Sequence, residues 1–228
     1  MIKNKKKKMN WKKIMEAFLL ITLILSIIYI IFKIIYAPTD AESSDTYTKV
    51  KSDYTLMLIQ CVLGIVIMRI PAIIERTKTI DIPDIMELLY FVFLYCAIYL
   101  GEVQNFYYLI PFWDNILHAF SGAMLGVLGF MIVNYLNEAE GWKIELNPFF
   151  VSFFAFCFAL TCGTVWEIYE FLCDGLLKTN MQKFALADET LLIGRDAVYD
   201  TMMDLIIDGL SAFVISTIGF FKLRKEGK

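Results

Sequence analysis

The most regular feature of the chain is a series of long apolar stretches separated by shorter polar ones. Six of them are long enough to cross a lipid bilayer as helices, since one span needs about 20 predominantly apolar residues. They lie at about residues 14–36, 56–75, 86–101, 115–136, 148–173 and 200–222. The pattern therefore predicts an all-α polytopic membrane protein, a six-helix transmembrane bundle.

The domain organisation follows from the same pattern. The sequence carries no repeat and no low-complexity tract, so we expect one six-span transmembrane domain over residues 14–223. A basic cytoplasmic tail at residues 1–13 precedes it, and a short cytoplasmic tail at residues 224–228 follows. The first span resembles a signal peptide in its basic start, but its apolar core is too long, so we expect an uncleaved anchor.

Composition supports a membrane location. Hydrophobic residues make up 58% of the chain and the mean hydropathy is +0.61, which excludes an ordinary soluble domain. We expect the lipid bilayer as a partner and no nucleic acid; a protein partner is not readable from the sequence. The five cysteines form no C-x-x-C pair, so neither a disulfide framework nor a zinc–thiolate site is indicated.

The distribution of Lys and Arg predicts the orientation, because these residues concentrate in cytoplasmic loops. With the N-terminus inside, 14 basic residues fall in cytoplasmic segments and 5 in outer ones. We therefore expect a multi-pass protein of a bacterial cytoplasmic membrane with both termini in the cytoplasm. The segment KNKKKK would lie on anionic lipids, which attract a nearby lysine by about 1 kcal/mol.

Acidic residues and the single histidine gather in the last three spans. At about 1.5 Å per residue, His118, Glu167 and Asp204 each lie roughly 7–9 Å inside the outer end of a helix. Helical spacing places further carboxylates on the same faces, so three helices should bring them to one layer that opens outward. The members of this layer are Asp114, His118, Glu167, Glu170, Asp200 and Asp204.

Such a layer requires positive charge. An acidic residue in mid-span costs about 2.5–3.5 kcal/mol on insertion scales, and we expect His118 to be the only cation near these five carboxylates. Either protons neutralise several of them or a divalent cation lies among them. We predict a metal site made by His118 with some of these five carboxylates, for Mg, Mn or Zn, because one imidazole with several oxygens suits these ions. Around them we place Asp174, Asp196, Asp208 and Glu102.

The same residues carry a family resemblance. The motifs are D-x-x-x-H-x-x-x-G at Asp114, His118 and Gly122, E-x-x-E at Glu167 and Glu170, and D-T-x-x-D at Asp200 and Asp204, with Gly194 upstream. In their order and spacing the chain resembles the YjdF-like bacterial inner-membrane proteins of unknown function, over about residues 85–215. The resemblance implies a shared membrane fold and a shared site, without a known activity.

Several functions fit these observations. The metal site could serve a membrane enzyme directed at a lipid headgroup or phosphate. A proton- or cation-coupled transporter could use the acids as a relay, although the uncharged inner halves of the helices argue against it. The chain could also be a non-catalytic component of a membrane complex. At the simplest, His118 is an interfacial histidine with one partner, and Asp114 or Asp200 is a helix N-cap.

Overall fold

A computed structural model describes residues 10–38, 49–76, 82–138, 146–186 and 190–226. Within these ranges the regular structure is helical, apart from one isolated bridge between Ala185 and Leu191. Six segments are long and apolar enough to cross a membrane, which confirms the predicted all-α, six-helix membrane protein. They are Trp11–Tyr36, Asp53–Arg76, Asp84–Val103, Trp113–Asn137, Pro148–Leu177 and Asp196–Lys225.

Individual helices begin and end near the predicted limits. The first, α1, begins at Trp11, within the stretch predicted as a tail. Some of the 14 basic residues counted as cytoplasmic lie outside the described residues: those at 1–9, Lys78, Lys143 and Lys228. The elements are α1 (Trp11–Tyr36), α2 (Lys51–Ile67), α3 (Ile70–Arg76), α4 (Asp84–Leu94), the π-helix η1 (Tyr95–Val103), α5 (Phe106–Leu109), α6 (Trp113–Glu138), α7 (Pro148–Leu177), the 3₁₀-helix η2 (Asp196–Val198) and α8 (Tyr199–Lys225).

Internal contacts divide the chain into two compact units. The first unit is Met1–Tyr36 with Tyr54–Asn105, and the second unit is Ala37–Asp53 with Phe106–Lys228. Each is a group of spanning helices with its own packing, and each is described by itself below. The single domain over residues 14–223 stays a prediction.

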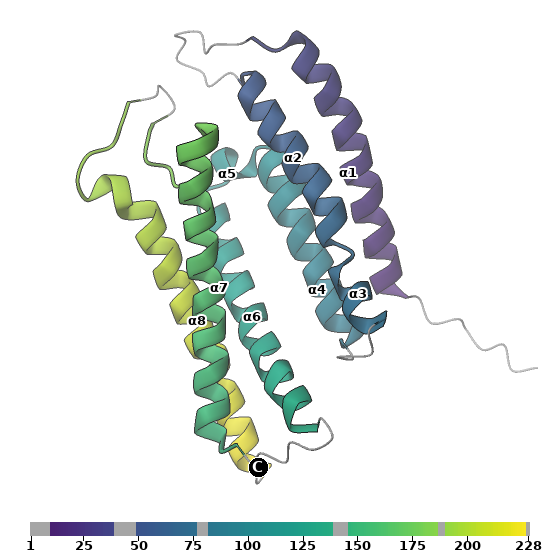
Figure 1. Cartoon of the computed structure of the whole chain (residues 1–228), viewed down its shortest axis with the longest axis vertical. Helices are drawn as coiled ribbons and strands as arrows, with labels where there is room; N and C mark the ends of the chain where they lie inside the picture. The colour runs from purple at the N-terminus through teal and green to yellow at the C-terminus, as the bar shows by residue number, and fades with distance from the viewer. Residues whose placement is uncertain (1–9, 39–48, 77–81, 139–145, 187–189, 227–228) are drawn as a thin grey trace, which may run out of the picture. The chain divides into compact units, whose positions relative to one another are not determined.

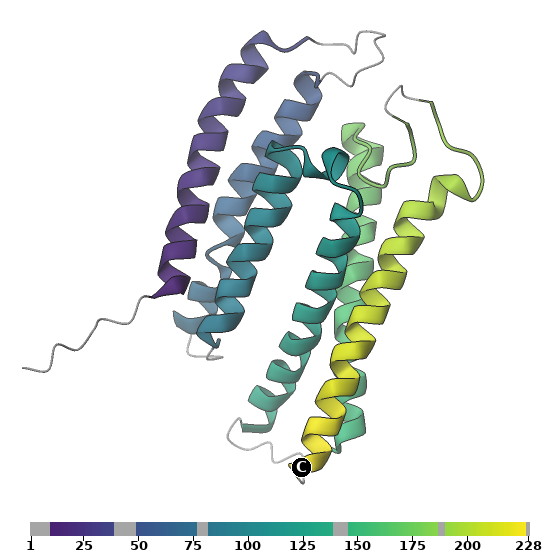
Figure 2. The ribbon, with the colours of Figure 1, turned by 180° about the vertical axis from the view of Figure 1, so that it is seen from behind.

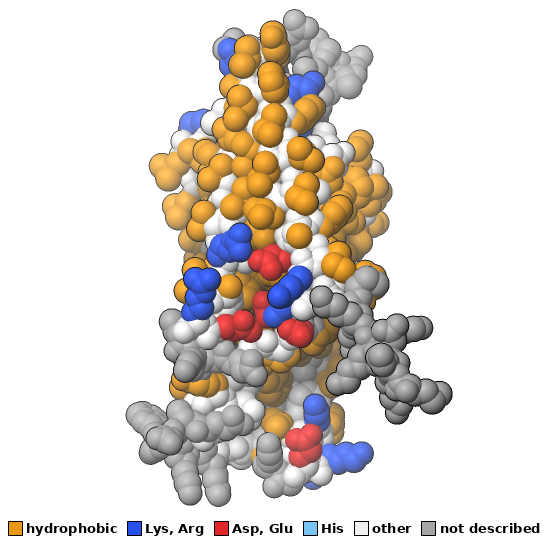
Figure 3. Space-filling view, turned by 90° about the vertical axis from the view of Figure 1, so that its right-hand side faces the viewer, with side chains coloured by type: hydrophobic (Ala, Val, Ile, Leu, Met, Phe, Trp, Pro, Cys, Tyr) orange, Lys and Arg blue, Asp and Glu red, His pale blue; other side chains and the backbone are white. Residues whose placement is uncertain are grey.

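The first unit packs α1, α2 and α4 side by side (Figures 1 and 2). Outside its core it is strongly apolar, and Figure 3 shows hydrophobic side chains covering much of the face that carries α1, with charged ones gathered lower down. Such a surface suits contact with lipid. Its buried core draws on all three helices: Leu19, Leu23, Ile30, Met57, Cys61, Met68, Phe91 and Leu94.

Ion pairs join the ends of these helices. Lys12 at the start of α1 reaches Glu87 (2.6 Å) and Asp84 (2.7 Å) at the start of α4. Glu87 is buried, so the ammonium of Lys12 supplies the charge that this carboxylate needs. Arg69 pairs with Glu16 at 3.1 Å in the same unit.

The second span is interrupted between α2 and α3. In a regular helix the N–H of residue 71 would donate to the carbonyl of Ile67, four residues earlier. Pro71 has no N–H, so this carbonyl loses its usual donor. The hydroxyl of Tyr90 on α4 donates to this carbonyl at 2.8 Å. Because hydrocarbon offers no water to an open backbone acceptor, Tyr90 makes the break compatible with a membrane span.

This arrangement generates a test by double-mutant cycle. Tyr90→Phe should lower the free energy of unfolding by about 1–3 kcal/mol, because a buried acceptor loses its donor. In a Pro71→Ala background the same change should cost clearly less, since an alanine at this position would restore the backbone donor. Thermal unfolding in detergent measures both, with the exposed Tyr36→Phe as control. Equal costs in the two backgrounds would contradict the assignment.

The second unit packs α6, α7 and α8 side by side in both ribbon views (Figures 1 and 2). Its site end is where α6 and α8 begin and α7 ends, and its far end is the opposite one. Toward the far end the packing is close: a Cβ added to Gly129 would lie 2.8 Å from Cα of Ala155, and one added to Gly219 would overlap the ring of Phe130. Asn147 caps the start of α7 by accepting from the Phe150 N–H at 2.8 Å.

Candidate metal centre

His118 lies buried at the site end of the second unit, one turn inside α6. Its Nε2 faces three carboxylates, one from each helix: Asp114 at 3.8 Å, Glu167 at 3.9 Å and Asp204 at 3.9 Å. Its other nitrogen, Nδ1, lies 3.2 Å from Oδ2 of Asp208. The ring is therefore fixed from one side and presents its second nitrogen to a ring of oxygens.

Glycines make room for Asp208. A Cβ on Gly163 of α7 would overlap Oδ2 of Asp208 and lie 2.9 Å from its Cγ. A Cβ on Gly122 of α6 would lie 3.1 Å from the Asp208 carbonyl oxygen. Any larger side chain at these two positions would push α8 away, so the short distance from Asp208 to His118 depends on both glycines.

Several carboxylate oxygens in this layer have no hydrogen-bond partner. Both oxygens of Glu167, Oδ2 of Asp204 and Oδ1 of Asp208 are buried without one. The side chains themselves are 5%, 1% and 2% exposed, so bulk water does not solvate them. Buried carboxylate oxygens are normally hydrogen-bonded or bound to a cation. These oxygens have no such partner among the described residues and are therefore available to bind a cation.

The helix dipoles affect the charge of some of these carboxylates. Asp114 and Asp200 lie in the first turns of α6 and α8, where the helix dipole favours a negative charge. Glu170 and Glu167 lie seven and ten residues before the end of α7 at Leu177, so no helix N-terminus stabilises their charge. Glu167 is buried as well, and neither of its carboxylate oxygens has a hydrogen-bond partner.

A lysine from the segment between α7 and α8 also reaches the layer. Nζ of Lys183 lies 2.6 Å from Asp114 and 2.8 Å from Asp200. The expectation that His118 is the only cation near the carboxylates is therefore wrong. Burial lowers the pKa of the Lys183 ammonium, but the charges of Asp114 and Asp200 outweigh it and hold the pKa above its usual value. Lys183 thus contributes a permanent positive charge.

Asp174 shapes the segment that carries Lys183. Its carboxylate accepts from the hydroxyl of Thr179 (2.6 Å) and from the N–H groups of Met181 (2.7 Å) and Gln182 (3.0 Å). The amide of Gln182 in turn donates to the hydroxyl of Thr201 on α8 at 2.8 Å. Asp174 is thus occupied by the loop.

The other predicted residues fall in different places. Glu170 accepts from the indole of Trp166 at 2.9 Å, and Asp200 pairs with Lys183. Asp200 is no N-cap, because Val198 holds that position without a side-chain cap. Asp196 is exposed, and Glu102 belongs to the first unit, where Gln60 donates to it at 3.0 Å.

Three residues meet the geometric requirement for a shared metal ion. Asp114, His118 and Asp204 can each offer one ligand atom, and these atoms lie within 4.8 Å of one another. They come from α6 and α8, and Glu167 approaches the same nitrogen of His118 from α7. This donor set of one imidazole and several oxygens suits a divalent cation of the Mg, Mn or Zn kind.

Comparison with known proteins places these residues in a family. A family described as "Predicted membrane protein (DUF2238)" matches residues 15–225, nearly the whole chain. The chain belongs to this family. The YjdF-like resemblance of its motifs is thereby confirmed.

A relative within the curated proteins is an uncharacterized protein of Thermotoga maritima. It is 28% identical to this DUF2238 chain over 153 residues, which cover 67% of the chain and 70% of the relative. No solved structure matches the chain. The comparisons therefore support a multi-pass membrane protein, and the chemistry of the site has to be argued from its own residues.

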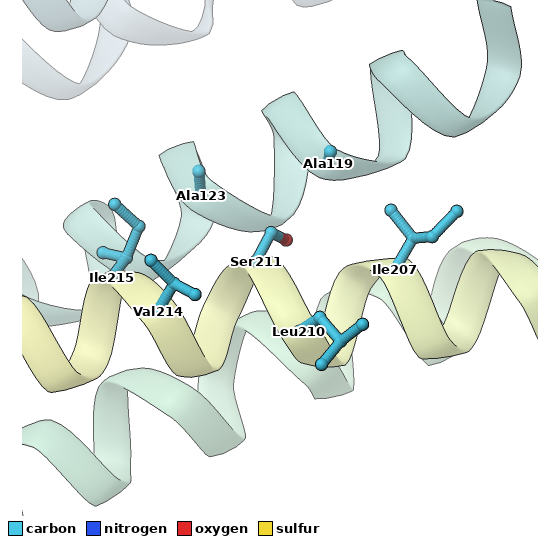
Figure 4. Close-up of a pocket in the computed structure, with 7 residues that line it drawn as sticks. All are labelled: Ala119, Ala123, Ile207, Leu210, Ser211, Val214 and Ile215. Carbon is cyan, nitrogen blue, oxygen red and sulfur yellow. The ribbon is translucent and has the colours of Figure 1, made fainter. Parts of the chain in front are cut away.

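An apolar groove of about 340 Å³ lies beside the site, along the seam of α6 and α8 (Figure 4). No ionisable side chain lines it, so the groove itself offers no group for acid–base chemistry or for binding a metal ion. The residues that line the groove are Ala119, Ala123, Ile207, Leu210, Ser211, Val214 and Ile215.

The glycine that accommodates Asp208 can be tested directly. Gly163→Ala should lower the free energy of unfolding by about 1–3 kcal/mol, because its methyl group overlaps the Asp208 carboxylate. Gly175→Ala on the same helix is the matched control, since nothing lies within 4 Å of the added Cβ and alanine favours a helix. Thermal unfolding in detergent should separate the two, and equal stabilities would refute the tight fit.

Proposed function

We propose that this membrane protein binds one divalent cation between α6, α7 and α8, with Nε2 of His118 and carboxylate oxygens of Asp114 and Asp204 as ligands and Glu167 as a fourth. The observation that supports it best is the position of Nε2, which faces three carboxylates on three helices at 3.8–3.9 Å. Around an ion with bonds of roughly 2.0–2.2 Å, neighbouring ligand atoms are about 2.8–3.6 Å apart, so the carboxylates would move inward by a few tenths of an ångström on binding. The spacing therefore suits a bound ion better than direct hydrogen bonds.

Asp208 has a separate role in this proposal. A metal-binding histidine commonly donates its second N–H to a carboxylate, which fixes the ring and its tautomer. Asp208 lies 3.2 Å from Nδ1 and is positioned for this contact. With the proton held on Nδ1, the lone pair of Nε2 points toward Asp114, Glu167 and Asp204. Asp208 is thus a positioning residue and not a ligand.

The proposal includes an orientation. We place the protein in a bacterial cytoplasmic membrane with both termini in the cytoplasm, so that the site opens outward. Lys222, Arg224 and Lys225 in the last turn of α8 support this, because they put positive charge at the far end of the second unit. The lysines at residues 3–8 would then lie on anionic lipids of the inner leaflet.

A site on one side of the membrane fits the packing better than a path through it. Transport would need access from both sides of the second unit. Toward its far end the helices approach closely at Gly129 and Gly219. These close contacts favour a site reached from one end, at which a lipid headgroup or phosphate could meet the bound cation.

Metal content tests the proposal. Detergent-purified protein should carry about one equivalent of Mg, Mn or Zn by elemental analysis, and a His118→Ala, Asp204→Asn double variant should carry none. Asp196→Asn, at an exposed aspartate just ahead of the same helix, should retain the metal. Metal-free wild-type protein after purification with added Mn²⁺ would rule the proposal out.

The role of Asp208 is tested by affinity. Asp208→Asn should weaken Mn²⁺ binding by roughly 10- to 100-fold without changing the number of ions bound, because the ring loses its orienting carboxylate. Titration of the apo-protein with Mn²⁺, followed by calorimetry, measures both quantities. An unchanged affinity in a variant of normal thermal stability would show that Asp208 does not position His118.

A further inference from the structure

The two carboxylate oxygens of Asp114 face two different groups. Its Oδ1 lies 3.8 Å from Nε2 of His118, whereas its Oδ2 accepts from Nζ of Lys183 at 2.6 Å. The carboxylate therefore lies between two adjacent positions for a cation, an inner one next to His118 and an outer one next to Asp200. In many metal centres a carboxylate between two ions is shared in this way.

The outer position already has the features of a cation site. Asp200 supplies Oδ1 to Lys183 at 2.8 Å, and its Oδ2 is buried without a hydrogen-bond partner. Oxygen atoms of Asp114 and Asp200 thus approach one ammonium at 2.6–2.8 Å. These distances exceed the bonds of Mg²⁺ (about 2.0–2.1 Å) by about 0.5–0.8 Å and those of Ca²⁺ (about 2.3–2.6 Å) by at most about 0.5 Å.

The loop holds Lys183 in this position by contacts of its own. Lys183 has a left-handed backbone, with φ of 48°, which a residue with a side chain adopts only where its surroundings impose it. On one side Met181 and Gln182 are bound to Asp174, and on the other the Ala185 N–H donates to Asn180 at 3.0 Å. These hydrogen bonds fix the backbone at Lys183, and the fixed backbone places its ammonium beside Asp114 and Asp200.

We propose that the ammonium of Lys183 occupies a second cation position of the site, made by Asp114 and Asp200, and thereby limits the site to a single divalent ion. The inference rests on the proposed function, because the inner position is the one that would hold the metal. Removing the ammonium should leave two neighbouring carboxylates without a counter-charge. A second divalent ion could then bind between these two carboxylates and balance their negative charge.

The test counts Mn²⁺ ions per chain in purified full-length protein. Wild-type protein should bind one Mn²⁺ and Lys183→Met should bind two, with the second lost again when Asp200→Asn is added. Lys183→Arg should stay at one, because the guanidinium keeps the charge. Lys178→Met is the matched control: Lys178 belongs to the same loop and has a similar φ of 57°, but its side chain is exposed.

The outcomes separate the inference from the function beneath it. One ion in both wild type and Lys183→Met, or two in wild type, would overturn the role of Lys183 while leaving metal binding intact. No ion in any of the proteins would contradict the proposed function itself. If Lys183→Met does not fold, Lys183→Gln removes the charge while retaining a donor, and the same two equivalents are expected.

Discussion

Carboxylates between membrane-spanning helices need a positive charge or a donor within reach, because neither water nor lipid solvates them there. In the second unit this requirement falls on Glu167, Asp204 and Asp208, all buried and each with at least one unpartnered oxygen. His118 alone cannot satisfy three such groups, and Lys183 serves only Asp114 and Asp200. This remaining imbalance is the physical reason for proposing a bound cation.

The packing of the helices follows from the same requirement. Gly122 and Gly163 lie where α8 brings Asp208 against α6 and α7, so the absence of side chains creates the place for a charged one. Asp174 fixes the loop, and the loop brings Lys183. The two glycines and Asp174 thus determine where the charged side chains of Asp208 and Lys183 lie. In the first unit, Tyr90 and Lys12 do the same for an open carbonyl and a buried Glu87.

Helical regularity explains how much the sequence could reveal. Six apolar stretches predicted the six spans, and the constant rise per residue placed His118 and Asp204 at similar depth. Angles around a helix do not show where a long side chain ends, so Glu170 was grouped with Glu167 although Trp166 takes its carboxylate. The direct contact of Asp208 with His118 depends on how α6 and α8 cross, which periodicity does not encode.

Lys183 was missed for a different reason. Its segment has no periodic pattern, and its path depends on hydrogen bonds to Asp174 from residues five to eight positions later. The available signal was a lysine in the loop that joins two acid-bearing helices. Likewise the break before Pro71 could be anticipated from the proline, but the donor Tyr90 lies on another helix and required the structure.

The central claim is that Nε2 of His118 binds a divalent ion, and pulsed electron paramagnetic resonance on Mn²⁺-loaded protein tests it most directly. The account predicts modulation from one imidazole ¹⁴N coupled to the manganese, lost in His118→Gln. Bound manganese whose spectrum shows no nitrogen coupling in the wild type would contradict it, since the ion would then lie away from this histidine.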